Sequence, residues 1–381
     1  MEAEVESYYR EYKDGIVSLL TLSGLWPEDS RQIKYVRVAL FSVTLIFELV
    51  FAGAVCNFAM VNSHKMSAVV ASVAVLISFI FVIAKLLVML IYKEDVLYLN
   101  RNLASYFESD LEITEYRPYL LAYYRVFYRF FKAHYYYFNA ILLFGMTAPI
   151  VAAFYGKSAR VYPIHPPFHY EPGGTRHWMI FVFEVISGAY SVTTTVSYDS
   201  LFGLYAFNLV GEIRLLTHRF RNLTPGKSYR NQLKECVDKH VILMNAKNVM
   251  QRLFGAMSVM LAITCAVIIC AQIFTLTTNK QLPVFKVAFL IDYIIAKLLQ
   301  AYMYAWFGNC ITVESEICLD AIYNAEWAGS GELRLMKDIL IVQSQNPMQF
   351  ETMGIMKVRL DMFLKIVNTS ISYFFLLKTV E

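Results

Sequence analysis

Long apolar stretches separated by charged segments dominate this chain of 381 residues. About 20 consecutive apolar residues suffice to cross the hydrocarbon core of a bilayer as a helix, and a stretch of that length indicates a spanning helix. Seven such stretches predict an all-α polytopic membrane protein with seven transmembrane helices. The predicted spans cover residues 36–61, 67–91, 133–155, 178–211, 253–278, 287–311 and 362–381.

The segments between the predicted spans differ in helical character. Residues 92–132 are charged but keep a helical pattern, so we expect them to extend the helices on either side into the cytosol. Residues 156–177 contain four prolines, which are incompatible with a helix. The fourth apolar stretch keeps its helical pattern for 34 residues. That length exceeds what a bilayer needs, so this helix is expected to project into the cytosol.

Composition supports a membrane protein. The chain is 57% apolar and 17% charged, whereas soluble proteins average roughly 45–50% apolar and about 25% charged residues. A net charge of +4 is too small to suggest nucleic-acid binding. Residues 1–35 are polar and contain no apolar core near Met1. We therefore expect no signal peptide, a cytosolic N-terminal segment over residues 1–35 and an uncleaved first span.

The distribution of Lys and Arg predicts the orientation of the chain, because cytosolic loops carry an excess of both residues. It places the N-terminus of a multi-pass membrane protein in the cytosol and its C-terminus outside. This orientation is opposite to that of a G-protein-coupled receptor, and it disfavours a metabotropic receptor. Segments 1–37, 92–132, 214–252 and 308–365 together hold 25 Lys and Arg, whereas segments 62–66, 155–177 and 278–286 hold 6.

The last predicted span carries one polar stripe along an otherwise apolar helix. Such a stripe faces either a neighbouring helix or water. The residues alone leave both interpretations open, and packing against another helix is the plainer one. At 100° per residue the stripe contains Lys365, Thr369, Ser372, Leu376 and Thr379, with Val380 at its end.

Charged residues inside the predicted spans are the first candidates for functional chemistry, because charges in lipid are costly. Asp199 and Asp292 draw most attention, although a satisfied carboxylate buried inside the bundle is the plainer interpretation for each. We expect Lys85 to snorkel towards the interface and Glu184 to lie near a span end. Neither aspartate belongs to a catalytic motif, so we expect no enzyme. The candidates are Glu48, Lys85, Glu184, Asp199, Asp292 and Lys297.

The cysteines and histidines show no metal-ligand spacing, so the sequence predicts neither a metal site nor a cofactor. We expect the cysteines to be buried free thiols. They are Cys56, Cys236, Cys265, Cys270, Cys310 and Cys318.

Short motifs in a fixed order make the chain resemble the insect odorant receptor family. The short loop over 214–248 resembles an odorant-tuned subunit, because the family's co-receptor has a long insertion there. The last span lacks the Gln-Phe of the related gustatory receptors. The motifs that carry the resemblance are Leu25-Trp26-Pro27, Phe307-Gly308-Asn309, Glu314-Ser315, Ala321, Tyr323, Trp327 and Ser372-Tyr373.

The resemblance implies a tetrameric, odorant-gated, nonselective cation channel formed with the odorant co-receptor subunit in the dendrite of a sensory neuron. It implies transmembrane helices one to six over residues 36–307, and a cytosolic anchor hairpin over 308–350 that turns at Ala328-Gly329-Ser330-Gly331. It also implies a pore-lining helix over residues 351–381. Leu376 and Val380 match the family's hydrophobic gate. The pore-lining residues are then Thr369, Ser372, Leu376, Thr379 and Val380.

The resemblance also implies an apolar pocket for a small volatile ligand, in the outer halves of spans two, three, four and six. The residues alone leave a secondary transporter open, although no inverted repeat supports it. They also leave open an intramembrane enzyme, which the lack of a catalytic motif disfavours, and a metabotropic receptor. The candidate ligand contacts are Leu76, Ile80, Leu142, Gly145, Met146, Pro149, Phe183, Ser187, Tyr190, Phe289 and Tyr293.

Overall fold

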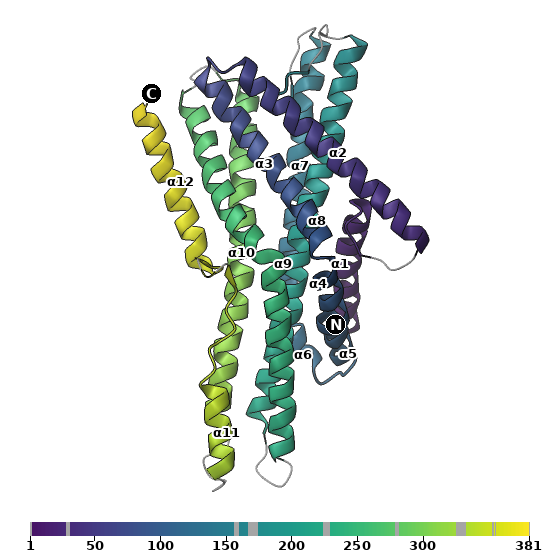
Figure 1. Ribbon diagram of the computed structural model, residues 1–381, viewed down its shortest axis with the longest axis vertical. Helices are drawn as coiled ribbons and strands as arrows, with labels where there is room; N and C mark the ends of the chain where they lie inside the picture. Colours follow the sequence, from purple (N-terminus) through teal and green to yellow (C-terminus); the bar gives the residue numbers. More distant parts are fainter. Residues whose placement is uncertain are drawn as a thin grey trace.

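The computed structural model is an elongated bundle of helices that run close to its long axis (Figure 1). It describes residues 2–27, 31–155, 160–166, 174–223, 229–278, 282–324, 333–352, 354 and 356–380.

Each predicted span lies on one long helix, which confirms the element type at all seven places. Five helical segments of the described chain are long and apolar enough to cross a membrane: 35–61, 66–91, 117–152, 175–221 and 229–278. The sixth and seventh spans stay predictions. The helices are α2 (Arg31–Val61), α3 (Met66–Ile91), α7 (Tyr124–Phe154), α8 (Thr175–Arg221), α9 (Tyr229–Thr278), α10 (Val284–Tyr323) and α12 (Leu360–Val380).

Three of these helices are much longer than a bilayer requires. Helices α8, α9 and α10 contain 47, 50 and 40 residues, or about 60–75 Å at about 1.5 Å per residue. Their excess length continues into the lower half of Figure 1. The predicted length of the fourth helix is confirmed, whereas its projection into the cytosol stays a prediction. Helix α9 begins well before its predicted span. Its first turns carry charged residues, so they gave no signal for a span although the helix is continuous.

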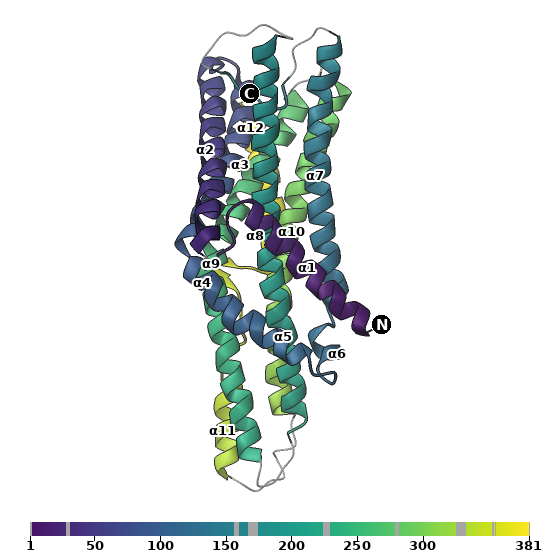
Figure 2. The ribbon, with the colours of Figure 1, turned by 90° about the vertical axis from the view of Figure 1, so that its right-hand side faces the viewer.

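A helix in the N-terminal segment was not predicted. Helix α1 (Glu2–Leu22) crosses α8 diagonally in Figure 2. Its apolar side chains recur every three or four residues, at Tyr9, Tyr12, Ile16 and Leu20, and all four are buried. The segment of α1 is too charged to give the signal of a membrane span. The spacing of its few apolar residues nevertheless favours an amphipathic helix.

The prediction that residues 92–132 continue the neighbouring helices is wrong for most of that segment. Helix α3 ends where Tyr92 leaves helical geometry, and α7 begins only at Tyr124. Between them a chain of short helices lies obliquely across α8 and α9 (Figure 2). Charge pairs hold it there, as Arg252 Nη2 lies 2.7 Å from Asp95 Oδ1. The short helices are α4 (Lys93–Leu99), the π-helix η1 (Asn100–Ala104), α5 (Ser105–Leu111) and α6 (Arg117–Leu120).

Below the predicted sixth span, α10 continues to Tyr323, and α11 (Leu333–Gln343) packs against it. The predicted turn at Ala328-Gly329-Ser330-Gly331 lies outside the described residues. The expectation that residues 351–381 form one helix is wrong at its start. Strands β1 (Glu351–Thr352) and β2 (Met356–Lys357) pair antiparallel before α12 begins. Gly354 in their turn has a φ of 68°, which favours glycine.

Hydrophobic packing is divided unevenly along the bundle. One large core joins α1, the short helices, α8, α9, α10, α11, the ends of α3 and α7 nearest the short helices, and the start of α12. The upper half is packed by three small clusters. The cysteines among the described residues are free, and all but Cys56 are buried, as expected. Burial raises the pKa of the Cys318 thiol to about 11, so this cysteine is unreactive.

Gly308 tests the packing of the chain that precedes α12. A Cβ at this position would lie 2.1 Å from the Val358 carbonyl oxygen. We predict that Gly308→Ala destabilises the protein by about 1–3 kcal/mol, because the backbone at Val358 must move to relieve the overlap. Gly255→Ala is the matched control, since the nearest atom there is 3.8 Å away. Thermal stability of the purified variants measures both, and equal melting of Gly308→Ala and wild type would contradict the packing.

Candidate functional site

Several predicted ligand contacts gather around an aromatic cluster in the upper half of the bundle. Phe51 of α2 stacks on Phe79 of α3, with ring centroids 4.3 Å apart. Phe183 of α8 stacks at 6.0 Å from Phe51, and Leu76 packs against the same cluster. Of these four, Leu76 and Phe183 were predicted, and Phe51 and Phe79 were missed.

A second group of predicted contacts lies where α7 meets α10. Phe289 and Tyr293 stack almost parallel, with ring centroids 6.5 Å apart. A Cβ on Gly145 would lie 3.0 Å from the Phe289 ring, so a glycine leaves α7 room for this close contact. The Tyr293 hydroxyl lies 2.6 Å from the Ser78 hydroxyl of α3. Ser78 was not predicted, although it lies close to Leu76 in the sequence.

Residues 160–166 pass between the two groups and insert Tyr162 into the bundle. The Tyr162 ring contacts Phe51 and Phe79 edge-on, at 5.1 and 5.9 Å. The loop is held by the His165 N–H, which donates to the Ala54 carbonyl at 3.2 Å. A proline-rich loop gives no periodicity, so its sequence could not place this ring.

Buried polar groups also lie beside these aromatic rings. Ser187 is fully buried, and its hydroxyl has no hydrogen-bond partner among the described residues. One residue further along α8, a Cβ on Gly188 would lie 2.7 Å from Leu142 of α7. Glu48 of α2 is also buried, and it accepts from the Ser191 hydroxyl at 2.8 Å. A ligand here would find aromatic faces and the Ser187 hydroxyl group.

The remaining predicted contacts are less closely grouped. The Tyr190 ring lies 5.8 Å from Phe47 of α2, on the far side of the Phe183 stack. Met146 is half-buried and Pro149 is buried within α7. Ile80 is 47% exposed and is not brought together with the others. Helical geometry explains the exposure of Ile80, because the buried residues of α3 lie on the side of the helix opposite to it.

Below the aromatic groups, Asp199 of α8 joins helices through a fully buried polar network. Lys85 of α3 donates to Asp199 Oδ1 at 2.7 Å, and Tyr304 of α10 donates to the same oxygen at 2.7 Å. The Gln300 amide donates to Oδ2 at 2.6 Å. The interpretation of Asp199 as a satisfied buried carboxylate is therefore confirmed. The expectation that Lys85 snorkels is wrong, because its ammonium group is paired inside the bundle.

The other charged span residues have weaker partners. Glu184 is fully buried, and Arg160 of the upper loop lies 3.8 Å from it. Lys297 donates to the Gln300 side chain at 3.2 Å. Asp292 is half-buried.

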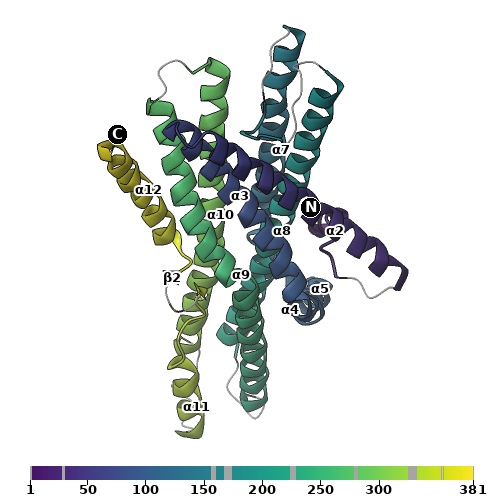
Figure 3. The same cartoon turned by 45° about the horizontal axis from the view of Figure 1, so that its top comes forward.

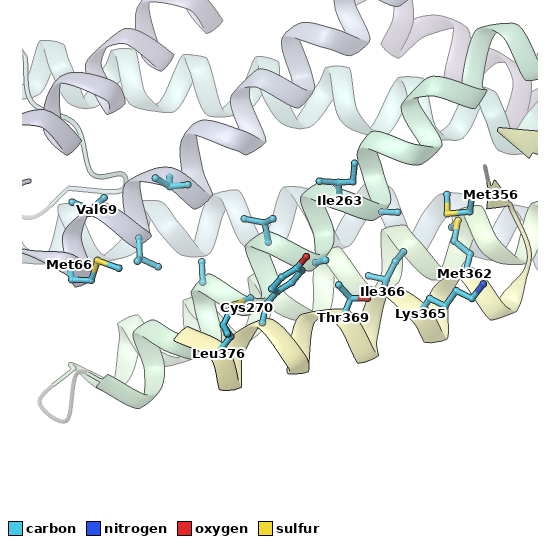
Figure 4. Close-up of a pocket in the computed structure, with 17 residues that line it drawn as sticks. Met66, Val69, Ile263, Cys270, Met356, Met362, Lys365, Ile366, Thr369 and Leu376 are labelled. Atoms are coloured by element: carbon cyan, nitrogen blue, oxygen red, sulfur yellow. The ribbon is translucent and has the colours of Figure 1, made fainter. Parts of the chain in front are cut away.

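Helix α12 lies at the edge of the bundle in Figure 3 and packs mainly on α9. Met362, Ile366 and Ser370 are buried, so the stripe predicted from Lys365 to Thr379 is not the packed face. Part of that stripe lines an apolar groove of about 680 Å³ between α12, α3 and α9 (Figure 4). The predicted pore residues on this groove are Thr369 and Leu376, whereas Ser372 and Thr379 are exposed and Val380 lies in the last turn.

Helices long and apolar enough to cross a membrane, packed through clusters of aromatic side chains, are typical of a helical membrane protein. The family described as "7tm Odorant receptor" matches residues 65–371. This range includes α3, α7, α8 and α10 of the candidate site and the first part of α12, whereas α2 lies before it. The chain belongs to this odorant receptor family.

Curated relatives are receptors of the same family. Odorant receptor 13a of Drosophila melanogaster is 24% identical over 265 residues, which is 63% of each chain. The match therefore spans less than two thirds of that receptor. Odorant receptor 46a, isoform A, from the same fly is 24% identical over the whole length of both chains. The odorant receptor coreceptor of Aedes aegypti matches only 39% of this chain and 31% of its own, which agrees with an odorant-tuned member.

Solved structures show the same fold. The insect olfactory receptor OR5 from Machilis hrabei superposes with a TM-score of 0.79 and 16% identity, covering 98% of each chain. The same receptor in complex with eugenol also gives 0.79, with 14% identity and full coverage of both chains. At these identities the likeness establishes the fold.

Asp199 gives the sharpest test of the buried network. We predict that Asp199→Asn destabilises the protein by about 3–5 kcal/mol, because Lys85 keeps a buried charge without a counter-charge. Asp95→Asn is the matched control, since the Arg252 side chain in that pair is 55% exposed and such pairs contribute about 0–1 kcal/mol. Thermal unfolding measures both variants. Similar melting temperatures for the two would contradict the role given to Asp199.

Proposed function

We propose that this chain is the odorant-tuned subunit of an odorant-gated, nonselective cation channel in the plasma membrane. The carrying observation is the family match over residues 65–371, which includes α3, α7, α8 and α10 of the aromatic site and the first part of α12. The subunit crosses the membrane seven times, with its N-terminus in the cytosol. It assembles with the odorant co-receptor subunit into a tetramer. Residues 308–350 form part of the cytosolic anchor.

The ligand is a small uncharged molecule with aromatic or aliphatic surface. It binds among α3, α7, α8 and α10, between the Phe183 stack and the Phe289–Tyr293 pair. Aromatic faces supply dispersion and stacking contacts. The Ser187 hydroxyl is free to bond a ligand oxygen, because no described residue occupies it. Eugenol bound to OR5 is a ligand of this size and polarity.

A chain of contacts joins this site to the polar network below it. The Lys297 ammonium lies 5.7 Å from the centre of the Tyr293 ring and also donates to Gln300. Gln300 and Tyr304 both bond Asp199. A ligand that displaces Tyr293 therefore acts on groups that hold α10 against α8.

The same chain of contacts continues to the start of α12. Tyr304 stacks on Phe202 of α8 at 4.8 Å, and Phe202 lies 5.3 Å from Phe350. The Phe350 carbonyl accepts from the Val358 N–H at 2.9 Å, just before α12 begins. We propose that movement of α10 reaches α12 by this route. The ligand opens the channel only to the extent that it binds the open state more tightly than the closed state.

The gate is formed by Leu376 together with Val380 from each subunit, and Thr369, Ser372 and Thr379 line the path. Leu376 is 60% exposed in the single chain, so it is available to a ring of subunits around a central axis. A ring of apolar side chains stops ions by excluding water, and widening it restores the path.

Whole-cell currents test the site and the gate together. The chain is expressed with the co-receptor and screened against small aromatic volatiles. For a ligand that bonds the Ser187 hydroxyl, Ser187→Ala is expected to raise the ligand concentration that gives half-maximal current about fivefold. That shift corresponds to one lost neutral hydrogen bond of about 1 kcal/mol. Exposed Ile80→Ala is the control, and we expect it to behave like wild type. An equal shift in both variants would contradict the placement of the site.

The double change Leu376→Ala and Val380→Ala is expected to produce current without ligand, because smaller side chains no longer exclude water. Leu364→Ala is the matched control, since Leu364 is a similarly exposed leucine near the start of the same helix. Unchanged ligand-evoked currents in the double variant would refute the gate assignment.

A further inference from the structure

The groove beside α12 has the shape of an amphiphile site. Its walls are almost entirely aliphatic and come from three helices: Val69 and Val73 of α3, Ile263 of α9, and Ile366 and Leu376 of α12. Figure 4 shows Leu376, Thr369, Ile366 and Lys365 in this order along α12, with Ile263 of α9 and Val69 of α3 across the groove. Its volume of about 680 Å³ falls within the roughly 300–1,000 Å³ of sites that hold small ligands.

At its Lys365 end the groove is lined by charged side chains instead of aliphatic ones. A smaller cavity of about 180 Å³ adjoins it and shares Met356, Met362 and Lys365 with it. Lys357 and Asp361 complete the smaller cavity. Lys357 lies 3.6 Å from Glu351, but its side chain is 52% exposed and remains accessible. Two ammonium groups therefore lie at the end of an aliphatic channel, with the carboxylates of Asp361 and Glu351 close to them.

The length and depth of the groove suit a lipid tail. Met362 and Leu376, at its two ends on α12, are about 21 Å apart along the helix at about 1.5 Å per residue. One leaflet of a bilayer contributes about 15 Å of hydrocarbon. In the proposed orientation, on which this step depends, Lys357 and Lys365 lie near the cytosolic face. That leaflet carries the anionic lipids.

We propose that this groove binds one anionic glycerophospholipid of the cytosolic leaflet. An acyl chain lies along α12 between α3 and α9, and the phosphate lies between Lys357 and Lys365. Asp361 favours a head group that also carries a hydrogen-bond donor, such as the ammonium of phosphatidylserine. Two lysines at the membrane surface each strengthen binding of an anionic head group. The bound lipid touches Leu376 and so supports the position of the proposed gate helix.

Lipid retention by the purified full-length protein tests the proposal. The protein in detergent is given phosphatidylserine or phosphatidylcholine, and native mass spectrometry measures the lipid that stays bound. Wild type is expected to retain phosphatidylserine preferentially. The double variant Lys357→Gln and Lys365→Gln is expected to lose that preference, by about fivefold for each lysine. Lys378→Gln, at the other end of α12, is the matched control and is expected to retain it.

A second variant tests the tail. Val73 is 38% exposed on the groove wall, so Val73→Trp can fill the groove without disturbing the core. We expect it to reduce retention of both lipids. Equal retention of the two lipids by wild type, or unchanged retention in Val73→Trp, would overturn the proposal. Because this readout needs no current, it fails or succeeds separately from the proposed channel activity.

Discussion

A carboxylate with no access to water constrains the whole bundle. Asp199 is fully buried, and a buried charge is tolerated only when it is paired and hydrogen-bonded. Its partners come from α3 and α10, while the His134 ring of α7 lies 3.8 Å away. A shift of α3 or α10 by one helical turn, about 5.4 Å, would break these bonds. The network therefore fixes the relative heights of the central helices at one level.

That level separates two kinds of packing. Below it one large core joins α1, the short helices and the long extensions of α8, α9 and α10. Above it only small clusters connect the helices, and a loop supplies Tyr162 as a shared filler. Packing is therefore more continuous below the network than above it.

The sequence predicted the long helices because their signal is local. Apolar runs of sufficient length specify a helix regardless of its neighbours. Helix α1 was missed because a few apolar positions on a charged segment leave its composition polar. The hairpin before α12 was missed because strands of two residues have no pattern of their own. The motif residue Gly308 gained a reason only from the structure, which brings the Val358 carbonyl against it.

The site was harder to predict than the fold. Periodicity places Leu76 and Phe183 on helices, but it cannot say that Phe79 faces the bundle while Ile80 does not. Lys85 and Asp199 are 114 residues apart, so their pairing depends on the height at which two helices pack. The polar stripe of α12 proved to be an edge of a groove in the single chain, with Thr369 and Leu376 on its wall.

A structure of the full-length chain bound to its activating ligand, together with the co-receptor in lipid, tests the central claim most directly. The account predicts ligand density among α3, α7, α8 and α10, beside Ser187 and Tyr293, with Lys85 still bonded to Asp199. Ligand density confined to the groove beside α12, with the upper aromatic groups unchanged from the free state, would contradict it.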